Sequence, residues 1–379
     1  MLGAGAVSLG LIEGVAEAAN SFLKILSGYF SDRWQVRKPI VIAGYALSSA
    51  VRPLVSLIGT WPQLLAVRLV DRVGKGIRGA PRDALLAAAA TSANRGRVFG
   101  FHRAMDHAGA VVGPLVASAF LFLFPGQYRW LFALTIVPGA LAVWVLFLVP
   151  EPRRRRAPGL ATSADSPGAA AAGVSGVSAE STPAPSWRDL PGRYYTVLAI
   201  VLVFTLGNSA DAFLLLRLSD EGVAPALIPL LWAMLHVVKA GMSMWGGILS
   251  DRWGRGLVIA GGWLVYAVVY TGFAFATSTH ALVAWFLFYG LYFGLAEGAE
   301  RALVADLAPP ALRGTAFGIF NAGVGVGALL ASVVFGLVWS AVSPAAAFGL
   351  GAALALLATG LLIALVRDPR TPRLTPYTN

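Results

Sequence analysis

The sequence contains no cysteine and few charged residues. Of its 379 residues, 12% are Asp, Glu, Lys or Arg, whereas 57% are hydrophobic. Without cysteine, neither a disulfide nor a thiolate metal site can form. A soluble domain carries about 25% charged residues, so this chain has too few to cover a surface that faces water. The four histidines show no metal-ligand spacing and no nucleophile–base arrangement is visible, so we expect no metal, no cofactor and no enzyme active site.

Long apolar stretches recur from one end of the chain to the other. A helix that crosses a bilayer needs roughly 20 mainly apolar residues. Because backbone amides in lipid must be satisfied within their own segment, such stretches predict helices. The sequence therefore predicts an all-α membrane protein embedded in the lipid bilayer, with eleven spans at 5–27, 39–59, 62–90, 98–123, 130–149, 193–215, 225–246, 257–277, 281–306, 315–340 and 345–366.

A polar segment divides the chain into two halves. It begins with four arginines, at positions 153–156, and continues as a run rich in Ala, Ser, Gly and Pro. Such a run buries too little apolar surface to order itself, which indicates a flexible linker. We therefore predict a helical bundle of five spans at 1–150, a cytoplasmic linker at 151–192, a bundle of six spans at 193–367 and a cytoplasmic tail at 368–379.

The net charge of +11 comes mostly from basic residues in the loops on one side of the spans. Cytoplasmic loops of membrane proteins carry an excess of Lys and Arg. The excess thus predicts orientation, with the C-terminus in the cytoplasm, and does not indicate a nucleic-acid partner. The residues on this side include Arg33, Arg37, Lys38, Arg95, Arg97, Arg252, Arg255, Arg313 and Arg367.

The two halves contain an internal repeat. The segment 28–34 (GYFSDRW) recurs as 247–253 (GILSDRW), and 95–100 (RGRVFG) recurs as 313–318 (RGTAFG). Both pairs of segments are separated by nearly the same number of residues, which is typical of transporters built from two related bundles. The same spacing places the partner of span 193–215 before Met1. The chain thus has eleven spans where the repeat implies twelve. We expect either a misassigned or truncated start or a lost helix, and a chain that is unstable or inactive alone.

Four motifs resemble those of the major facilitator superfamily. The loop signature of that family is similar to Gly28–Lys38, with Gln35 at a usual glycine, and to Gly247–Arg255. Its fourth-helix signature is similar to Arg72–Gly76, with Lys75 replacing glutamine. Its antiporter signature resembles the segment that contains Gly109, Gly113 and Pro114.

This resemblance covers essentially the whole chain, and the similarity lies with the drug and metabolite efflux branch. It implies two bundles around a central cavity, with eleven of the twelve family helices present. It also implies alternating access by rocking, a monomer, and a multi-pass location in a bacterial-type inner membrane.

The span 62–90 carries a charged stripe with five basic residues and two acidic ones. Because charges at mid-bilayer are costly, this stripe cannot face lipid and must line a cavity or form pairs inside the bundle. One hypothesis is that Asp71 and Asp83 neutralise neighbouring arginines as structural pairs. The other is that a substrate anion balances the excess, with substrate-binding candidates Arg68, Arg72, Lys75, Arg78 and Asn208.

Buried carboxylates are candidates for proton coupling, because burial raises the pKa of such a group toward neutrality. We predict this role for Glu13, Glu17, Asp106 or Asp211. Glu13 and Glu17 could instead pair with basic residues of the stripe. The nearby histidines at positions 102 and 107 suit a proton relay, although each can equally be a hydrogen-bonded packing residue.

The repeated Ser-Asp-Arg segments are interpreted as gating loops. In the family that the chain resembles, the first of these loops closes the cytoplasmic side against the other half. By that resemblance Asp32 and Arg33 should lie near Arg313 and Gly314. The gating candidates are Gly28, Asp32, Arg33, Gly247, Asp251 and Arg252.

Together these features predict a secondary active transporter, coupled to protons, that exports a small anionic or amphiphilic molecule. One alternative is an uptake carrier for organic anions. Another is a membrane sensor or scaffold that keeps the fold without transport, which predicts a fully paired stripe and a closed cavity.

Overall fold

The computed structural model describes residues 6–150, 186–224 and 227–366, and the side chains of α1 from residue 20 onward. The first half comprises α1 (Ala6–Arg33), α2 (Lys38–Val51), η1 (Arg52–Leu57), α3 (Trp61–Ala89), α4 (Arg95–Leu123), α5 (Tyr128–Ala133) and α6 (Ile136–Leu148). The second comprises η2 (Trp187–Asp189), α7 (Gly192–Gly207), α8 (Ala212–Asp220), α9 (Ile228–Trp253), α10 (Arg255–Phe275), α11 (Thr279–Leu307), η4 (Pro310–Leu312), α12 (Arg313–Ala341) and α13 (Pro344–Leu365).

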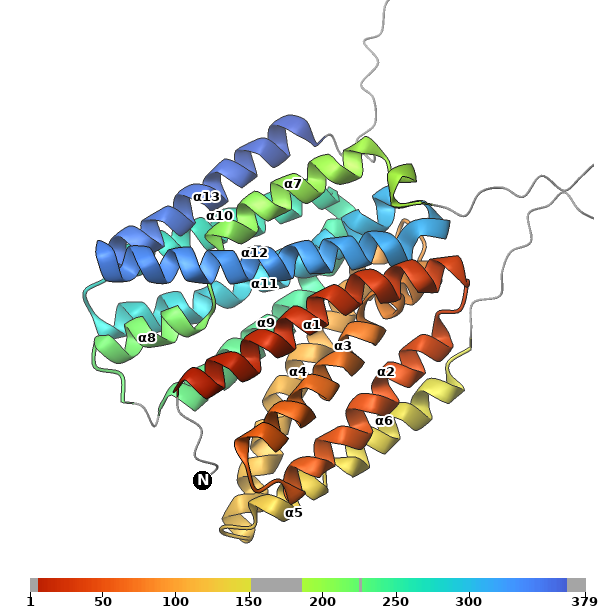
Figure 1. The fold of residues 1–379 in the computed structure, drawn as a ribbon. Coiled ribbons are helices and arrows are strands. Elements are labelled where there is room, and N and C mark those ends of the chain that lie inside the picture. The colour runs from red at the N-terminus through yellow and green to blue at the C-terminus, as the bar shows by residue number, and fades with distance from the viewer. Residues whose placement is uncertain (1–5, 151–185, 225–226, 367–379) are drawn as a thin grey trace, which may run out of the picture.

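The helices form two bundles, one from each half of the sequence (Figure 1). The all-α prediction is confirmed. Each predicted span corresponds to one long helix or to a broken pair such as α5 with α6, or α7 with α8. Within the described residues, nine segments are long and apolar enough to cross a membrane, which makes this a multi-pass membrane protein. The two charged helices α1 and α3 are not among the nine.

The predicted gating loops are in fact the last turns of two helices. Asp32 and Arg33 end α1, and Asp251 and Arg252 lie in the final turn of α9. The chain reverses in the short turns that follow these residues, before α2 and α10 begin. The first turn has Gln35 at φ +54°, and Gly254 stands at the equivalent place of the second half with φ +95°.

The last residues of the predicted linker are folded. The hydroxyl of Ser186 accepts a hydrogen bond from the Arg188 N–H, and Tyr195 donates to the Trp187 carbonyl at 2.5 Å. Leu190 is buried. This segment therefore belongs to the second bundle, whereas residues 151–185 and 367–379 lie outside the described residues.

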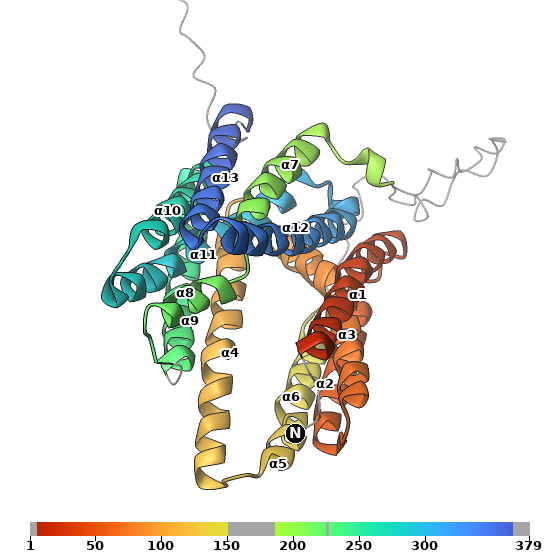
Figure 2. The same cartoon turned by 60° about the vertical axis from the view of Figure 1, so that its left-hand side comes forward.

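The two bundles meet along two helix pairs, α1 with α12 and α4 with α9. In the α1–α12 pair, a Cβ at Gly28 would meet the backbone carbonyl of Gly314. In the α4–α9 pair, a Cβ at Gly247 would meet that of Gly96. Glycine is needed at these crossings because any larger residue would hold the two backbones further apart. Figure 2 shows α4 beside the second half, away from α1, α2 and α3.

Candidate functional site

Asp32 caps the start of a helix in the other half. Its carboxylate accepts hydrogen bonds from the N–H groups of Gly314 (3.0 Å) and Thr315 (2.6 Å) in the first turn of α12. Arg37 donates to the same carboxylate at 2.9 Å. Negative charge is stabilised at a helix N-terminus, so this contact, the first clamp, holds α1 and α12 together. The predicted proximity of Asp32 to Gly314 is confirmed.

Asp251 forms a matching second clamp from the opposite half. It accepts hydrogen bonds from the N–H groups of Gly96 (2.9 Å) and Arg97 (2.8 Å), at the start of α4. Arg255 donates to Asp251 at 2.6 Å and to Asp306 at 3.1 Å, and its side chain is 1% exposed. Each half therefore caps a helix of the other, and both clamps lie at the end of the molecule predicted to face the cytoplasm.

The arginines next to these aspartates do not take part in the clamps. Arg33 donates to Tyr29 of its own helix at 2.9 Å, and Arg252 is exposed. The basic partners are instead Arg37 and Arg255, which follow the turns. A residue that directly follows the clamp aspartate points about 100° around the helix, so adjacency in sequence was the wrong signal.

A polar cavity of about 340 Å³ lies between the two halves. Six basic and two acidic side chains line it, with helices α1, α3 and α4 on one side and α11 and α12 on the other. Low-dielectric walls lined by one sign of charge attract ions of the opposite sign. The lining residues are Asn20, Lys24, Lys75, Arg78, Gly79, Arg82, Asp83, Arg103, Asp106, Arg301 and Asn321.

Two of the predicted substrate-binding residues, Lys75 and Arg78, line this cavity. Arg68 is exposed, and neither it nor Arg72 is part of the lining. Asn208 lies elsewhere in the second half, where its amide donates to the Tyr292 hydroxyl at 3.1 Å. The structure therefore brings together only the residues in the second half of the α3 stripe.

The acidic residues of the stripe are paired, as the structural hypothesis states. Asp71 contacts Arg52 at 2.9 Å and Lys75 at 3.2 Å. Asp83, which is 1% exposed, contacts Arg82 at 3.2 Å and forms an ion pair with Arg301 of the other half.

Arg78 lines the cavity and has no carboxylate contact among the described residues. Its guanidinium donates to the Ser48 hydroxyl at 3.0 Å and lies 4.1 Å from the centre of the Tyr45 ring. Neither contact supplies negative charge, and the ion pairs of the described residues include none with Arg78. An anionic group in the cavity could provide the missing counter-charge.

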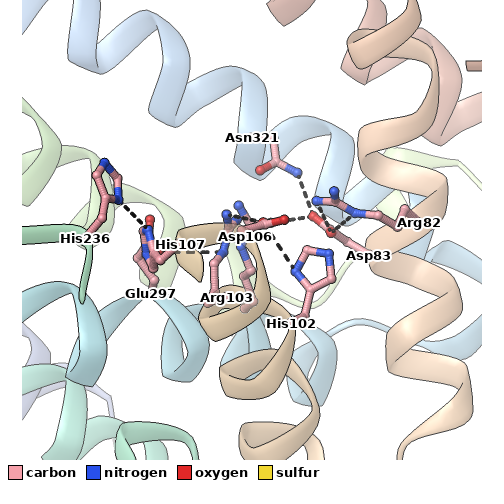
Figure 3. A network of polar contacts seen from close by, with 10 residues as sticks. Arg82, Asp83, His102, Arg103, Asp106, His107, His236, Glu297 and Asn321 are labelled. Atoms are coloured by element: carbon pink, nitrogen blue, oxygen red, sulfur yellow. Dashed lines mark hydrogen bonds and ion pairs between the residues drawn. The ribbon is translucent and has the colours of Figure 1, made fainter. Parts of the chain in front are cut away.

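A network of polar contacts extends from this cavity into the seam between α4 and α9 (Figure 3). Arg103 contacts Asp106 at 3.2 Å and Glu297 at 3.7 Å. Glu297 lies 3.3 Å from Nε2 of His107, and Nδ1 of His107 lies 3.2 Å from Nδ1 of His236. The network thus joins α4 of the first half to α9 and α11 of the second.

The predicted proton carriers have different surroundings. Asp106 lines the cavity and lies 3.6 Å from His102. Asp211 contacts Lys239 at 3.1 Å and accepts a hydrogen bond from Tyr289 at 2.9 Å. The side chains of residues 13 and 17, both predicted carriers, lie outside the described part of α1.

The antiporter-type motif lies on an exposed face of α4. Gly109, Gly113 and Pro114 are exposed, and α4 continues through the proline without a break. Within the described residues, no atom lies within 4 Å of a Cβ placed at Gly109 or Gly113. The two glycines therefore do not serve a close approach to another helix of the described part of the chain.

Sequence comparison identifies the family. The model of the Major Facilitator Superfamily matches residues 2–238 and, as a second overlapping match, 196–378. The chain belongs to the major facilitator superfamily. Members of this superfamily are transporters of small molecules and not enzymes, which confirms the class predicted from the sequence.

Two relatives illustrate the range of this superfamily. An uncharacterised MFS-type transporter of Methanocaldococcus jannaschii, MJ1317, is 31% identical over 96% of this chain and 87% of its own length. The multidrug resistance protein MdtH of Aeromonas salmonicida is 24% identical, over 85% of this chain and 76% of its own.

Solved structures of the superfamily share the fold. The human organic anion transporter MFSD10 superposes with a TM-score of 0.73 at 16% identity, covering 93% of this chain and 83% of its own. The proton:xylose symporter XylE gives a TM-score of 0.72 at 17% identity, covering 95% and 86%. At such low identity these structures support the two-bundle fold alone.

Proposed function

We propose that this transporter moves a small organic anion through the central cavity, with protons as the coupling ion and export as the direction. The observation that carries the proposal is the excess of basic side chains around the cavity, six against two acids. Arg78 strengthens it, because a half-buried cation without a carboxylate contact favours a ligand that brings negative charge. The multidrug resistance name of the relative MdtH supports export.

Closure at one end supports alternating access. Both clamps lie at the end predicted to be cytoplasmic, where helix N-termini of one half are capped by carboxylates of the other. An arrangement closed at that end corresponds to the outward-facing member of an alternating-access cycle. The predicted orientation and this closure together support a cavity that lies on the route between the two sides.

The scaffold hypothesis predicts a different arrangement of the same residues. It predicts that the stripe is fully paired and that no cavity separates the halves. A cavity of about 340 Å³ and the unbalanced Arg78 both favour transport over that hypothesis.

One observation favours uptake as a second candidate. Arg103 lines the cavity and also contacts Glu297, which in turn contacts His107. An anion that draws Arg103 into the cavity leaves Glu297 short of positive charge, and protonation of His107 would restore it. Anion and proton would then bind together and travel in the same direction, which is uptake under an inward proton gradient.

The test is a proton-flux assay in proteoliposomes that contain a pH-sensitive dye. A pH gradient is imposed, and a panel of mono-, di- and tricarboxylates and aromatic sulfonates is added outside. We expect at least one anion to change the rate at which the gradient decays, with opposite signs for exchange and for cotransport. Arg78→Gln should abolish the response, because it removes the cation that lacks a carboxylate contact.

Arg129→Gln is the matched control, since Arg129 is an exposed arginine of α5 outside the cavity. This variant should respond like the unmodified chain. Neutral sugars and organic cations are tested in parallel, and proton flux driven by these and by no anion would contradict the proposed substrate class. Flux of anions without any proton movement would contradict the coupling ion.

A further inference from the structure

The seam between α4 and α9 contains a pair of histidines from opposite halves of the molecule. Nδ1 of His107 and Nδ1 of His236 are 3.2 Å apart, and both residues are buried, with 9% of their surface exposed. At this distance one nitrogen must donate a proton and the other must accept it. The contact therefore depends directly on how many protons the two imidazoles carry.

The surroundings determine which nitrogen donates. Nε2 of His107 lies 3.3 Å from the Glu297 carboxylate. The positive charge of Arg103, at 3.7 Å, favours the ionised form of that carboxylate. An ionised carboxylate only accepts hydrogen bonds, so His107 carries its proton on Nε2 and presents a bare Nδ1. His236 must then donate from its own Nδ1.

Several fixed charges face this pair. On α4 and α11, Arg103 is shared between Asp106 at 3.2 Å and Glu297 at 3.7 Å. On α9 and at the start of α8, Lys239 offsets Asp211 at 3.1 Å. Arg301 of α11 is engaged by a carboxylate of α3. The remaining neighbours are aromatic rings, among them Phe293 and Trp232. A first added proton is therefore balanced by Glu297, which His107 contacts at 3.3 Å, whereas a second introduces a charge with no described carboxylate in contact to balance it.

We propose that His107 and His236 form the proton-binding site of this transporter, and that their protonation separates α4 from α9. A first added proton is accommodated if His236 moves its own proton to Nε2 and accepts from His107. A second makes both Nδ1 atoms donors, so the hydrogen bond is lost and two positive charges face each other across the seam. That this site drives transport depends on the proposed function, whereas the separation itself does not.

The seam can be measured without any substrate, because protons are the only ligand required. The chain has no cysteine, so two introduced cysteines can be spin-labelled without interference. Val116→Cys on α4 and Leu230→Cys on α9 suit this purpose, since both side chains are well exposed, at 61% and 57%. The distance between the two spin labels is measured by double electron–electron resonance on the full chain in lipid nanodiscs, between pH 8 and pH 4.

We expect a single short distance at pH 8 and a longer one that replaces it at low pH. Near the midpoint the ratio of long to short should rise by up to about tenfold per pH unit for each proton bound. His107→Gln and His236→Gln should each remove this dependence, because glutamine does not titrate. His280→Gln, at an exposed histidine of α11, should leave it unchanged.

Two results would overturn the proposal. One is a distance in the unmodified chain that does not depend on pH, a result that needs no folded variant. The other is a pH dependence that survives in both glutamine variants and disappears in His102→Gln, which would move the site to the contact between His102 and Asp106. If the anion assay fails while the seam titrates as expected, only the transport proposal is contradicted.

Discussion

Replacing Asp251 with asparagine should open the second clamp. The carboxylate accepts two backbone hydrogen bonds from Gly96 and Arg97 and one from Arg255. An asparagine of the same shape retains one neutral acceptor oxygen and presents an NH₂ group to the remaining donors. Gly96 and Arg255 donate to one carboxylate oxygen and Arg97 to the other, so the variant loses the bond from Arg97 and keeps the other two only as bonds to a neutral oxygen.

The cost can be worked out from these contacts. A hydrogen bond to a charged group contributes about 1.5–3 kcal/mol and one to a neutral group about 0.5–1.5 kcal/mol, so losing the bond from Arg97 and weakening that from Gly96 removes about 3 kcal/mol from the closed arrangement. Because about 1.4 kcal/mol is a factor of ten in an equilibrium constant, the ratio of open to closed molecules should rise about 100-fold.

Spin labels across the clamp provide the assay. Arg97→Cys and Arg252→Cys carry them, since both side chains are exposed and belong to opposite halves. We expect one short distance in the parent and a substantial longer population after Asp251→Asn. Asp189→Asn is the control, because that carboxylate is exposed and hydrogen-bonds only within its own turn. An unchanged distance distribution in Asp251→Asn would refute the reasoning.

Two further variants test the packing and the buried charges. Gly28→Leu should destabilise the fold by about 1–3 kcal/mol or more, because its side chain meets the α12 backbone, whereas Gly256→Leu, with open space around it, should not. Denaturant unfolding followed by tryptophan fluorescence measures both, and equal stabilities would contradict the close approach. Asp211→Asn should cost about 3–5 kcal/mol by stranding Lys239, which is 2% exposed. Adding Lys239→Met should recover most of that loss, and strictly additive losses would show that the pair is not coupled.

The fold could be predicted from the sequence because its signals are local and repeated. Apolar stretches of the length of a bilayer indicate helices, and the recurrence of the Ser-Asp-Arg segments indicates two related bundles. The recurrence showed that Asp32 and Asp251 occupy equivalent places, and the family resemblance predicted the contact of Asp32 with Gly314. The capping of α4 by Asp251 became visible only in the structure.

The partners within the site could not be predicted in the same way. Apolar periodicity does not reveal that Arg37 and Arg255, after the turns, would displace Arg33 and Arg252 from the clamps. The contact between the two seam histidines joins residues that are far apart in the chain, and it depends on the angle at which α4 and α9 cross.

The stripe on α3 was a correct signal for charge and an incomplete one for position. Its periodicity placed seven charged residues on one face, yet only its second half lines the cavity. Arg68 lies on the same face of the helix but is exposed, because a face extends along the whole helix while a cavity occupies a few turns. Depth along the helix axis depends on tertiary packing, which the hydrophobic pattern does not encode.

The reciprocal capping of the two halves has a consequence for how sharply this protein can switch. Both capped helices start at the same end, so a rocking motion that separates the two halves at that end breaks both clamps. The two losses then add in a single barrier, and a molecule with one clamp open gains little freedom in return. Opening of this end is therefore a cooperative two-state transition, in which the state with only one clamp open is the least populated.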